Sequence, residues 1–168
     1  MAPISADELK RLMLVVFDFD GVFTDNKVYV SQDGTESVRC DRGDALGLRR
    51  LREGGVAMLI LSTEANPVVA ARGKKLGLPV AQNCADKREW LRQRLVEEGM
   101  DPATVAFVGN DMNDLPAMEL AGLAVCPADA HPAVAARARW VLSRRGGEGA
   151  VREFCEIVAD AREAVPNV

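Results

Sequence analysis

Acidic and amide side chains gather at two points of the sequence, each directly after a short apolar run. The segment FDFDGVFTD holds Asp18 and Asp20, and the segment GNDMNDLP holds Asn110, Asp111 and Asp114. If the two segments converge, several like charges lie close together, which is unfavourable without a counter-ion. Oxygen ligands without His or Cys suit Mg²⁺ rather than zinc. The pattern therefore predicts a magnesium site.

Further groups suit a phosphate ester at the same place. Ser62 and Thr63 follow the apolar run LIL, and Lys87 begins a predicted helix. A hydroxyl, an amine and free backbone amides beside Mg²⁺ can bind a dianionic phosphoryl group. Of the pair Asp18 and Asp20, one aspartate can attack phosphorus as a nucleophile. The other can protonate the leaving oxygen and then deprotonate a water molecule.

The elements that position these side chains are short apolar runs alternating with helical patterns. Strands are predicted over 12–17, 56–61, 105–108 and 123–125, with weaker candidates at 79–82 and 140–142. Helices are predicted over about 44–53, 112–121, 131–138 and 149–163, after an N-cap at Asn66, and after Asp86 in a capping box with Glu89. This alternation predicts an α/β fold, a three-layer doubly wound (Rossmann-like) parallel sheet that binds ligands at the carboxyl ends of its strands.

The domain organisation follows from the spacing of these elements. We expect one domain over residues 1–168, with a β-hairpin insertion at about 27–40 and a C-terminal helix and tail at about 146–168. The stretches between Asp25, Ser62 and Lys87 are filled by the hairpin, helices and a short strand. Neither stretch leaves room for a separate cap domain.

Composition excludes several classes of function. The 168 residues carry a net charge of −4 and a pI near 5.1, so a nucleic-acid partner is not expected. The apolar run that ends at Phe17 is too short to cross a membrane. The start of the sequence does not have the pattern of a signal peptide, so we expect a cytoplasmic protein without a membrane partner.

The segments DFDGVFTD and LILSTE, Lys87 and the segment GNDMNDLP resemble, in this order, the four motifs of the haloacid dehalogenase (HAD) superfamily of phosphatases. The resemblance runs from about residue 12 to about residue 160. It is strongest to the capless branch of 3-deoxy-manno-octulosonate 8-phosphate phosphatases and of the HAD-like domains fused to some CMP-sialic acid synthetases. The hairpin and the segments DRGDALGLRRL and GGEGAVREF add to it.

The resemblance implies a role for each matching residue. Asp18 is implied as the nucleophile, Asp20 as the general acid/base, Ser62 as a ligand of a phosphoryl oxygen and Lys87 as the partner of the phosphoryl group and the nucleophile. The implied Mg²⁺ ligands are the Asp18 carboxylate, the Asp20 carbonyl and Asn110, with Asp111 and Asp114 orienting metal-bound waters and Lys87. The candidates for substrate contact are Gly21, Thr63, Arg42 and Arg152, with surface ion pairing the alternative for the two arginines.

Two positions depart from the family pattern. Asn110 stands where an acid is usual, so one negative charge fewer faces the metal and the Mg²⁺ affinity should be lower. Thr63 and Glu64 stand where the octulosonate phosphatases have Gly-Arg. Both departures are similar to the synthetase-fused domains.

Members of this branch form tetramers in which a neighbouring subunit covers the open site. The resemblance therefore implies a homotetramer, with Lys27–Cys40 at the interface and Gly146–Arg152 reaching a neighbour's site.

The function predicted on these grounds is Mg²⁺-dependent hydrolysis of a small phosphorylated 2-keto-3-deoxy sugar acid through an aspartyl-phosphate. The expected substrate is of the octulosonate 8-phosphate or the nonulosonate (sialic acid) 9-phosphate type. One alternative is a weakly active or inactive HAD-like oligomerisation domain associated with N-acylneuraminate cytidylyltransferase function. Another is a phosphoacceptor module of the response-regulator type, although no acid ends the predicted strand at 79–82.

Overall fold

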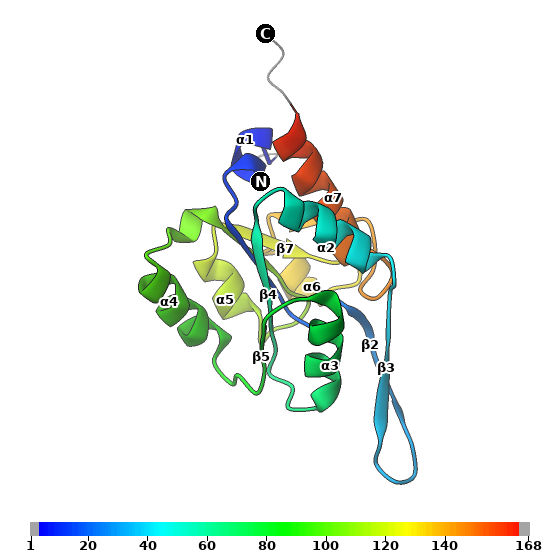
Figure 1. Ribbon diagram of the computed structural model, residues 1–168. Coiled ribbons are helices and arrows are strands. Elements are labelled where there is room, and N and C mark those ends of the chain that lie inside the picture. Colours follow the sequence, from blue (N-terminus) through cyan, green and yellow to red (C-terminus); the bar gives the residue numbers. More distant parts are fainter. Residues whose placement is uncertain (1–3, 165–168) are drawn as a thin grey trace.

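Six parallel strands form the central sheet of the computed structural model, which describes residues 4–164 (Figure 1). In sheet order they are β5 (Val80–Ala81), β4 (Ala57–Leu61), β1 (Leu14–Phe17), β6 (Val105–Val108), β7 (Leu123–Cys126) and β8 (Trp140–Val141). β1 lies between β4 and β6, and its last residue, Phe17, pairs with Ile60 on one side and Val108 on the other. The first polar residues after β1, β4 and β6 therefore meet at one edge of the sheet.

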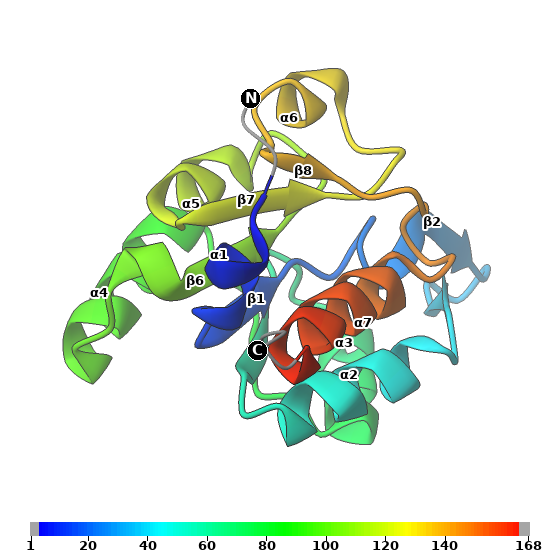
Figure 2. The same ribbon diagram turned by 90° about the horizontal axis from the view of Figure 1, so that it is seen from above.

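Helices cover both faces of this sheet, as Figure 2 shows. One face packs against α1 (Ala6–Lys10), α2 (Asp44–Glu53), α3 (Pro67–Leu76) and α7 (Ala150–Glu163). The other packs against α4 (Lys87–Glu98), α5 (Leu115–Leu120) and α6 (Pro132–Ala135). Along β1 the side chains alternate, so that Val15 and Phe17 enter one core and Leu14 and Val16 the other. The predicted three-layer doubly wound fold is confirmed.

The predicted hairpin is confirmed and begins three residues earlier than expected. Its strands, β2 (Thr24–Val30) and β3 (Glu36–Cys40), pair antiparallel, and the ribbon projects from the body of the molecule (Figure 1). Three consecutive apolar residues near its tip, Val28, Tyr29 and Val30, are exposed.

Most predicted helices are present, with corrections at their ends. Asn66 caps α3 through the amide of Val68, as predicted. Asp86 caps α4 through the amide of Glu89, but the reciprocal half of the predicted capping box is wrong, because the Glu89 carboxylate pairs with Arg92 and Gln93 instead. The helix expected over 112–121 spans only Leu115–Leu120, and the one expected over 131–138 spans only Pro132–Ala135. A 3-10 turn, Pro102–Thr104, precedes β6.

The C-terminal segment packs against the loop that follows β1. The amide of Gly147 donates to the carbonyl of Val22 over 3.1 Å, and a Cβ on Gly146 would lie 2.0 Å from the carbonyl oxygen of Gly21. Only a residue without a side chain fits there. The predicted segment 146–168 runs past the described residues, because residues 165–168 lie outside them, as do residues 1–3. Within residues 4–164, no helix is long and apolar enough to cross a membrane.

Candidate active site

The carboxyl ends of β1, β4 and β6 bring most of the predicted site residues together. Asp18 directly follows β1, and its amide donates to the carbonyl of Val108 in β6 over 2.9 Å. Ser62 directly follows β4, and Asn110 lies two residues after β6. A cavity of about 110 Å³ opens at this edge, and its lining residues are Asp18, Asp20, Asn26, Ser62, Thr63, Asn110, Asp111 and Asn113.

A buried ion-pair triad lies behind the cavity. The Lys87 ammonium contacts Asp18 Oδ1 and Asp114 Oδ1, each at 2.7 Å, and all three side chains are buried. Asp114 Oδ2 accepts hydrogen bonds from the amides of Asn110 and Asp111, which ties the loop after β6 to the triad. Asp114 is the N-cap residue of α5, but its carboxylate is used in this way and makes no side-chain capping hydrogen bond to the helix. A buried charge pair of this kind is costly unless each charge is compensated, as it is here.

Burial shifts the proton affinities of these groups. Desolvation, with the nearby charge of Asp114, raises the pKa of Asp18 to about 7, although Lys87 opposes the shift. Burial disfavours the charged form of Lys87, but the attraction of Asp18 and Asp114 outweighs it and the net pKa of Lys87 is raised. Desolvation also raises the pKa of Asp20, against a hydrogen bond from Thr24 that lowers it. A raised pKa suits Asp20 to the role of a proton donor.

The side-chain amide of Asn110 lies beside two acceptors next to the triad, Asp18 Oδ2 and the main-chain carbonyl oxygen of Asp20. The two ends of an amide have nearly the same shape, so either its oxygen or its nitrogen can face them. With the oxygen turned towards them, three acceptors meet, which is electrostatically unfavourable unless a cation lies among them. A carboxylate, a carbonyl and an amide oxygen are the donor types that Mg²⁺ takes, so the predicted metal ligands fit the ion. The carbonyl and the amide are necessary to this ligand set, because within residues 4–164 no group of three or more His, Cys, Asp or Glu side chains could hold a metal.

Gly21 allows this convergence. Its φ of +78° is in the left-handed region, and a Cβ there would lie 1.9 Å from Asn110 Nδ2. Its amide donates to Thr24 Oγ1 over 3.1 Å. Gly21 therefore lies against the Asn110 side chain and sets the path of the loop, while the predicted contact with substrate stays a prediction.

The hydroxyl of Ser62 is placed to donate into the cavity. Its Oγ accepts a hydrogen bond from the amide of Glu64 over 3.1 Å, which leaves the hydroxyl hydrogen free for another acceptor. Ser62 is buried and the adjacent Thr63 is exposed, and both line the cavity. Asp111 also lines it, with Oδ1 accepting from the amide of Met112.

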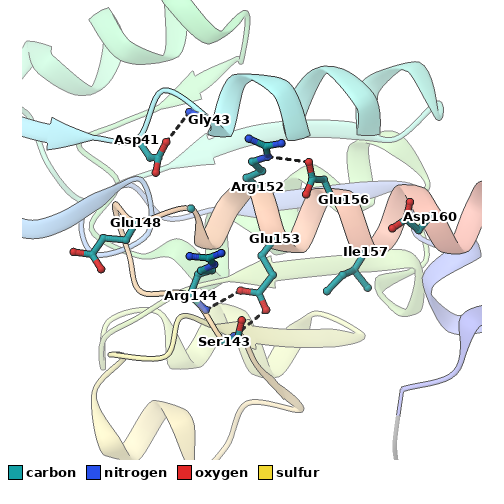
Figure 3. A pocket seen from close by; sticks show the side chains of 11 residues that line it. Asp41, Gly43, Ser143, Arg144, Glu148, Arg152, Glu153, Glu156, Ile157 and Asp160 are labelled. Carbon is teal, nitrogen blue, oxygen red and sulfur yellow. Dashed lines mark hydrogen bonds and ion pairs between the residues drawn. The ribbon is translucent and has the colours of Figure 1, made fainter.

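The two predicted arginines do not join this cluster within the chain. Arg152, in the first turn of α7, lines a separate groove of about 650 Å³ along that helix and pairs with Glu156 at 2.8 Å (Figure 3). Arg42 is exposed in the connection between β3 and α2. Neither lines the cavity that holds Asp18.

Two residues at the site were missed by sequence reasoning. Thr24 is fully buried, and its hydroxyl lies 3.3 Å from Asp20 Oδ1 as a donor. Asn26 lines the cavity with a φ of 60°. The signal was present in the segment FTDN, since Thr bonds neighbouring backbone groups in turns and Asn tolerates the left-handed region.

Known proteins match this chain over most of its length. Residues 62–154, more than half of the chain, match the model of the haloacid dehalogenase-like hydrolase family. The chain is 33% identical over 160 residues to the 3-deoxy-D-manno-octulosonate 8-phosphate phosphatase KdsC of Escherichia coli strain K12, which covers 93% of this chain and 85% of that protein. It is also 31% identical to N-acylneuraminate cytidylyltransferase A of Danio rerio, covering 89% of this chain but 35% of that protein.

Solved structures have folds similar to that of this chain. A putative HAD family hydrolase from Streptomyces avermitilis superposes with a TM-score of 0.86 at 46% identity, over 95% of this chain and 88% of that one. The 3-deoxy-D-manno-octulosonate 8-phosphate phosphatase from Moraxella catarrhalis, solved with a magnesium ion, a phosphate ion and a KDO molecule, gives a TM-score of 0.89 at 28% identity, over 94% of this chain and 91% of that one.

The chain therefore belongs to the haloacid dehalogenase-like hydrolase family. Within that family it is a phosphatase similar to the KdsC enzymes, and the predicted family and enzyme class are confirmed.

Proposed function

We propose that this phosphatase hydrolyses the phosphate monoester of a small 2-keto-3-deoxy sugar acid, of the octulosonate 8-phosphate or nonulosonate 9-phosphate type. The observation that carries the proposal is the position of Asp18. Its carboxylate is held by Lys87 at 2.7 Å, at the wall of a cavity that Asp20 and Ser62 also line. The names of the KdsC relatives support the choice of substrate.

The chemistry divides between the two aspartates. An oxygen of the Asp18 carboxylate forms a bond to phosphorus while the bond from phosphorus to the sugar oxygen breaks, and Asp20 gives its proton to that leaving oxygen. Asp20, now ionised, then takes a proton from a water molecule whose oxygen bonds to phosphorus while the bond between Asp18 and phosphorus breaks, which releases inorganic phosphate and restores the Asp18 carboxylate. Lys87 favours the ionised form of Asp18 against the burial that raises its pKa, and Ser62 donates a hydrogen bond to a phosphoryl oxygen.

Mg²⁺ is the cofactor in this proposal, held by the Asp18 carboxylate, the Asp20 carbonyl and Asn110. When bound, it supplies positive charge to the phosphoryl oxygens. Asp111 and Asp114 stay predicted as residues that orient metal-bound waters, and Asp114 additionally holds Lys87.

The size of the cavity supports an open site. A volume of about 110 Å³ suits a phosphoryl group, whereas cavities that enclose whole organic ligands are several times larger, about 300–1,000 Å³. The sugar acid therefore lies outside the cavity, over a rim that includes Asn26 and Thr63.

We propose that a second copy of the chain covers this rim in a homotetramer joined through the hairpin. Val28, Tyr29 and Val30 are 50%, 66% and 62% exposed, and exposed apolar residues on a two-stranded ribbon favour association. Arg42 and Arg152 would then contact substrate only in a neighbour's site. Light scattering tests this: Tyr29→Glu should lower the mass of the assembly, whereas Val96→Glu, on the exposed face of α4, should not. An unchanged mass for Tyr29→Glu would contradict the hairpin interface.

The substrate is tested by phosphate release from a panel of phosphorylated sugars, with Mg²⁺ and with EDTA. We expect metal-dependent turnover concentrated on the 8- or 9-phosphate of a 2-keto-3-deoxy sugar acid. Equal rates on simple sugar phosphates would contradict the substrate class. The single-domain organisation over residues 1–168, the cytoplasmic location and the lack of a nucleic-acid or membrane partner stay predictions.

A second candidate is a weakly active oligomerisation domain associated with N-acylneuraminate cytidylyltransferase function. The match to the Danio rerio enzyme and the neutral Asn110 favour it. The intact triad of Asp18, Lys87 and Asp114 favours the phosphatase. Negligible phosphate release by folded, Mg²⁺-bound protein across the panel would favour the second candidate.

A further inference from the structure

The side-chain amide of Asn110 occupies an unusual position for a neutral group. It is buried between the loop after β1 and the loop after β6, against the bare Cα of Gly21. The amide lies beside Asp18 Oδ2 and the Asp20 carbonyl oxygen, and either end of the amide fits there. With the oxygen turned towards these two acceptors, the amide has the orientation that a metal ligand needs.

A half-turn of the same amide about its last side-chain bond produces the opposite arrangement. Nδ2 then lies 2.8 Å from the Asp20 carbonyl oxygen and 3.3 Å from Asp18 Oδ2, and donates a hydrogen bond to each. An amide can do this because it carries two donors and an acceptor in nearly the same shape. An aspartate at this position could only add a further acceptor while it is ionised.

We propose that Asn110 is a two-position residue that takes the place of the cation when the metal is absent. With Mg²⁺ bound, its oxygen completes the ligand set. Without Mg²⁺, the amide turns and its two N–H groups bridge Asp18 and the Asp20 carbonyl, so the loops after β1 and β6 stay joined. The inference rests on the proposed metal site but not on the identity of the substrate.

Two properties follow from this exchange. The metal-free protein keeps the site assembled, because both acceptors are satisfied and a buried acceptor without a partner would be destabilising. Metal binding is weakened, because each ion must displace two hydrogen bonds and also lacks the additional carboxylate charge that an acid at position 110 would supply. Compared with a protein that has an acid at position 110, this protein therefore binds Mg²⁺ more weakly and is more stable when Mg²⁺ is absent.

Thermal unfolding in EDTA and in Mg²⁺ measures the stability, and calorimetric titration measures the Mg²⁺ affinity. In EDTA, Asn110→Asp should lower Tm by about 3–6 °C, because a carboxylate replaces the donor and faces Asp18. The same variant should bind Mg²⁺ roughly tenfold more tightly and show a larger Tm increase on binding. Gln32→Glu is the matched control, since it makes the same change from amide to carboxylate at an exposed position in the turn between β2 and β3, outside the cavity lining, and both of its values should stay near those of the wild type.

The amide itself can be observed by nuclear magnetic resonance. The side-chain N–H signals of Asn110 are identified by their loss in Asn110→Asp. In EDTA we expect them to be protected from exchange with water, and on adding Mg²⁺ we expect them to shift and lose that protection. A simple packing role would leave both properties unchanged by Mg²⁺.

The outcomes separate this inference from the proposed function. Unprotected signals in EDTA, signals that ignore bound Mg²⁺, or an Asn110→Asp variant with an unchanged Tm in EDTA would each overturn the two-position amide. Absence of phosphate release by the same Mg²⁺-bound protein would overturn the phosphatase proposal alone.

Discussion

Two concave regions of this molecule contain charged residues and differ in almost every other respect. The groove along α7 measures about 650 Å³ and the cavity at the strand ends about 110 Å³. The groove's ion pair, Arg152 with Glu156, has side chains 43% and 38% exposed, whereas the Lys87 side chain beside the cavity is 1% exposed. Convergence of buried charge, rather than volume, therefore marks the site of chemistry, because only desolvated charges interact strongly.

The largest effect is expected from Asp18→Asn. Loss of the carboxylate nucleophile should lower kcat by about 10³-fold or more, since an amide cannot form the aspartyl-phosphate. Steady-state phosphate release measures this, with circular dichroism to show that the fold is kept. Substantial remaining activity in a folded variant would contradict the assignment of the chemistry to the cavity that holds Asp18.

The next largest effect concerns stability. Lys87→Met leaves Asp18 and Asp114 buried without their shared cation, so the free energy of unfolding should fall by about 3–5 kcal/mol. Glu156→Gln in the groove is the control and should cost about 0.5 kcal/mol or less, because its ion pair is exposed. Urea denaturation at neutral pH compares them, and equal losses would show that the two regions do not differ as described.

Asp44 is a buried carboxyl beside the groove whose titration affects stability. Asp44 accepts a hydrogen bond from the amide of Arg152 through Oδ1, while its buried Oδ2 has no hydrogen-bond partner. Burial, aided by the charge of Asp41, raises the pKa of Asp44 from 3.8 to about 7. Because the folded protein holds this proton more tightly than the unfolded chain, the contribution to stability is present below the unfolded pKa and is lost as pH rises towards about 7.

Asp44→Asn should remove that contribution, since a neutral amide does not titrate and can still accept from Arg152. The free energy of unfolding, measured for both proteins between about pH 4 and pH 8, should show a wild type that loses stability relative to the variant as pH rises. Parallel curves would show that Asp44 is ionised throughout this range.

The smallest effect is expected within the groove. Glu153 accepts hydrogen bonds from the amides of Ser143 and Arg144, which joins α7 to the segment after β8. Glu153→Ala should cost about 1–2 kcal/mol of stability and leave kcat/KM unchanged, since these contacts are structural. A large loss of kcat/KM at unchanged stability would assign the groove a part in the reaction.

The site residues that could be predicted from the sequence are those whose position follows from the strand that precedes them in the chain. Asp18, Ser62 and Asn110 each follow a buried strand. Parallel strands of one sheet bring such residues together at their carboxyl ends, independently of the conformation of the connecting loops. The same holds for the N-caps at Asn66 and Asp86, which act within one turn.

What could not be predicted depends on contacts distant in sequence. The place of Arg152 is set by how α7 packs on α2, which no local pattern encodes. The contacts of Asp114 with Lys87 and with the loop after β6 leave its side chain without a capping bond to α5, which begins only at Leu115. Helix α1 was missed although Ser5 and Glu8 form the reciprocal capping box that was predicted at Asp86 and Glu89. A five-residue helix has too short a pattern for periodicity to detect.

The most direct test of the central claim, that Asp18 is the nucleophile, is to trap its phosphorylated form. Acetyl phosphate is small enough for the open cavity, and its leaving group needs no proton, so Asp20→Asn should still be phosphorylated but should lose the base that activates water. After incubation with acetyl phosphate and Mg²⁺ and an acid quench, peptide mass spectrometry should find one phosphoryl group on Asp18, persistent in Asp20→Asn and transient in the wild type. Phosphorylation at another residue, or none in the folded, Mg²⁺-bound Asp20→Asn protein, would contradict the account.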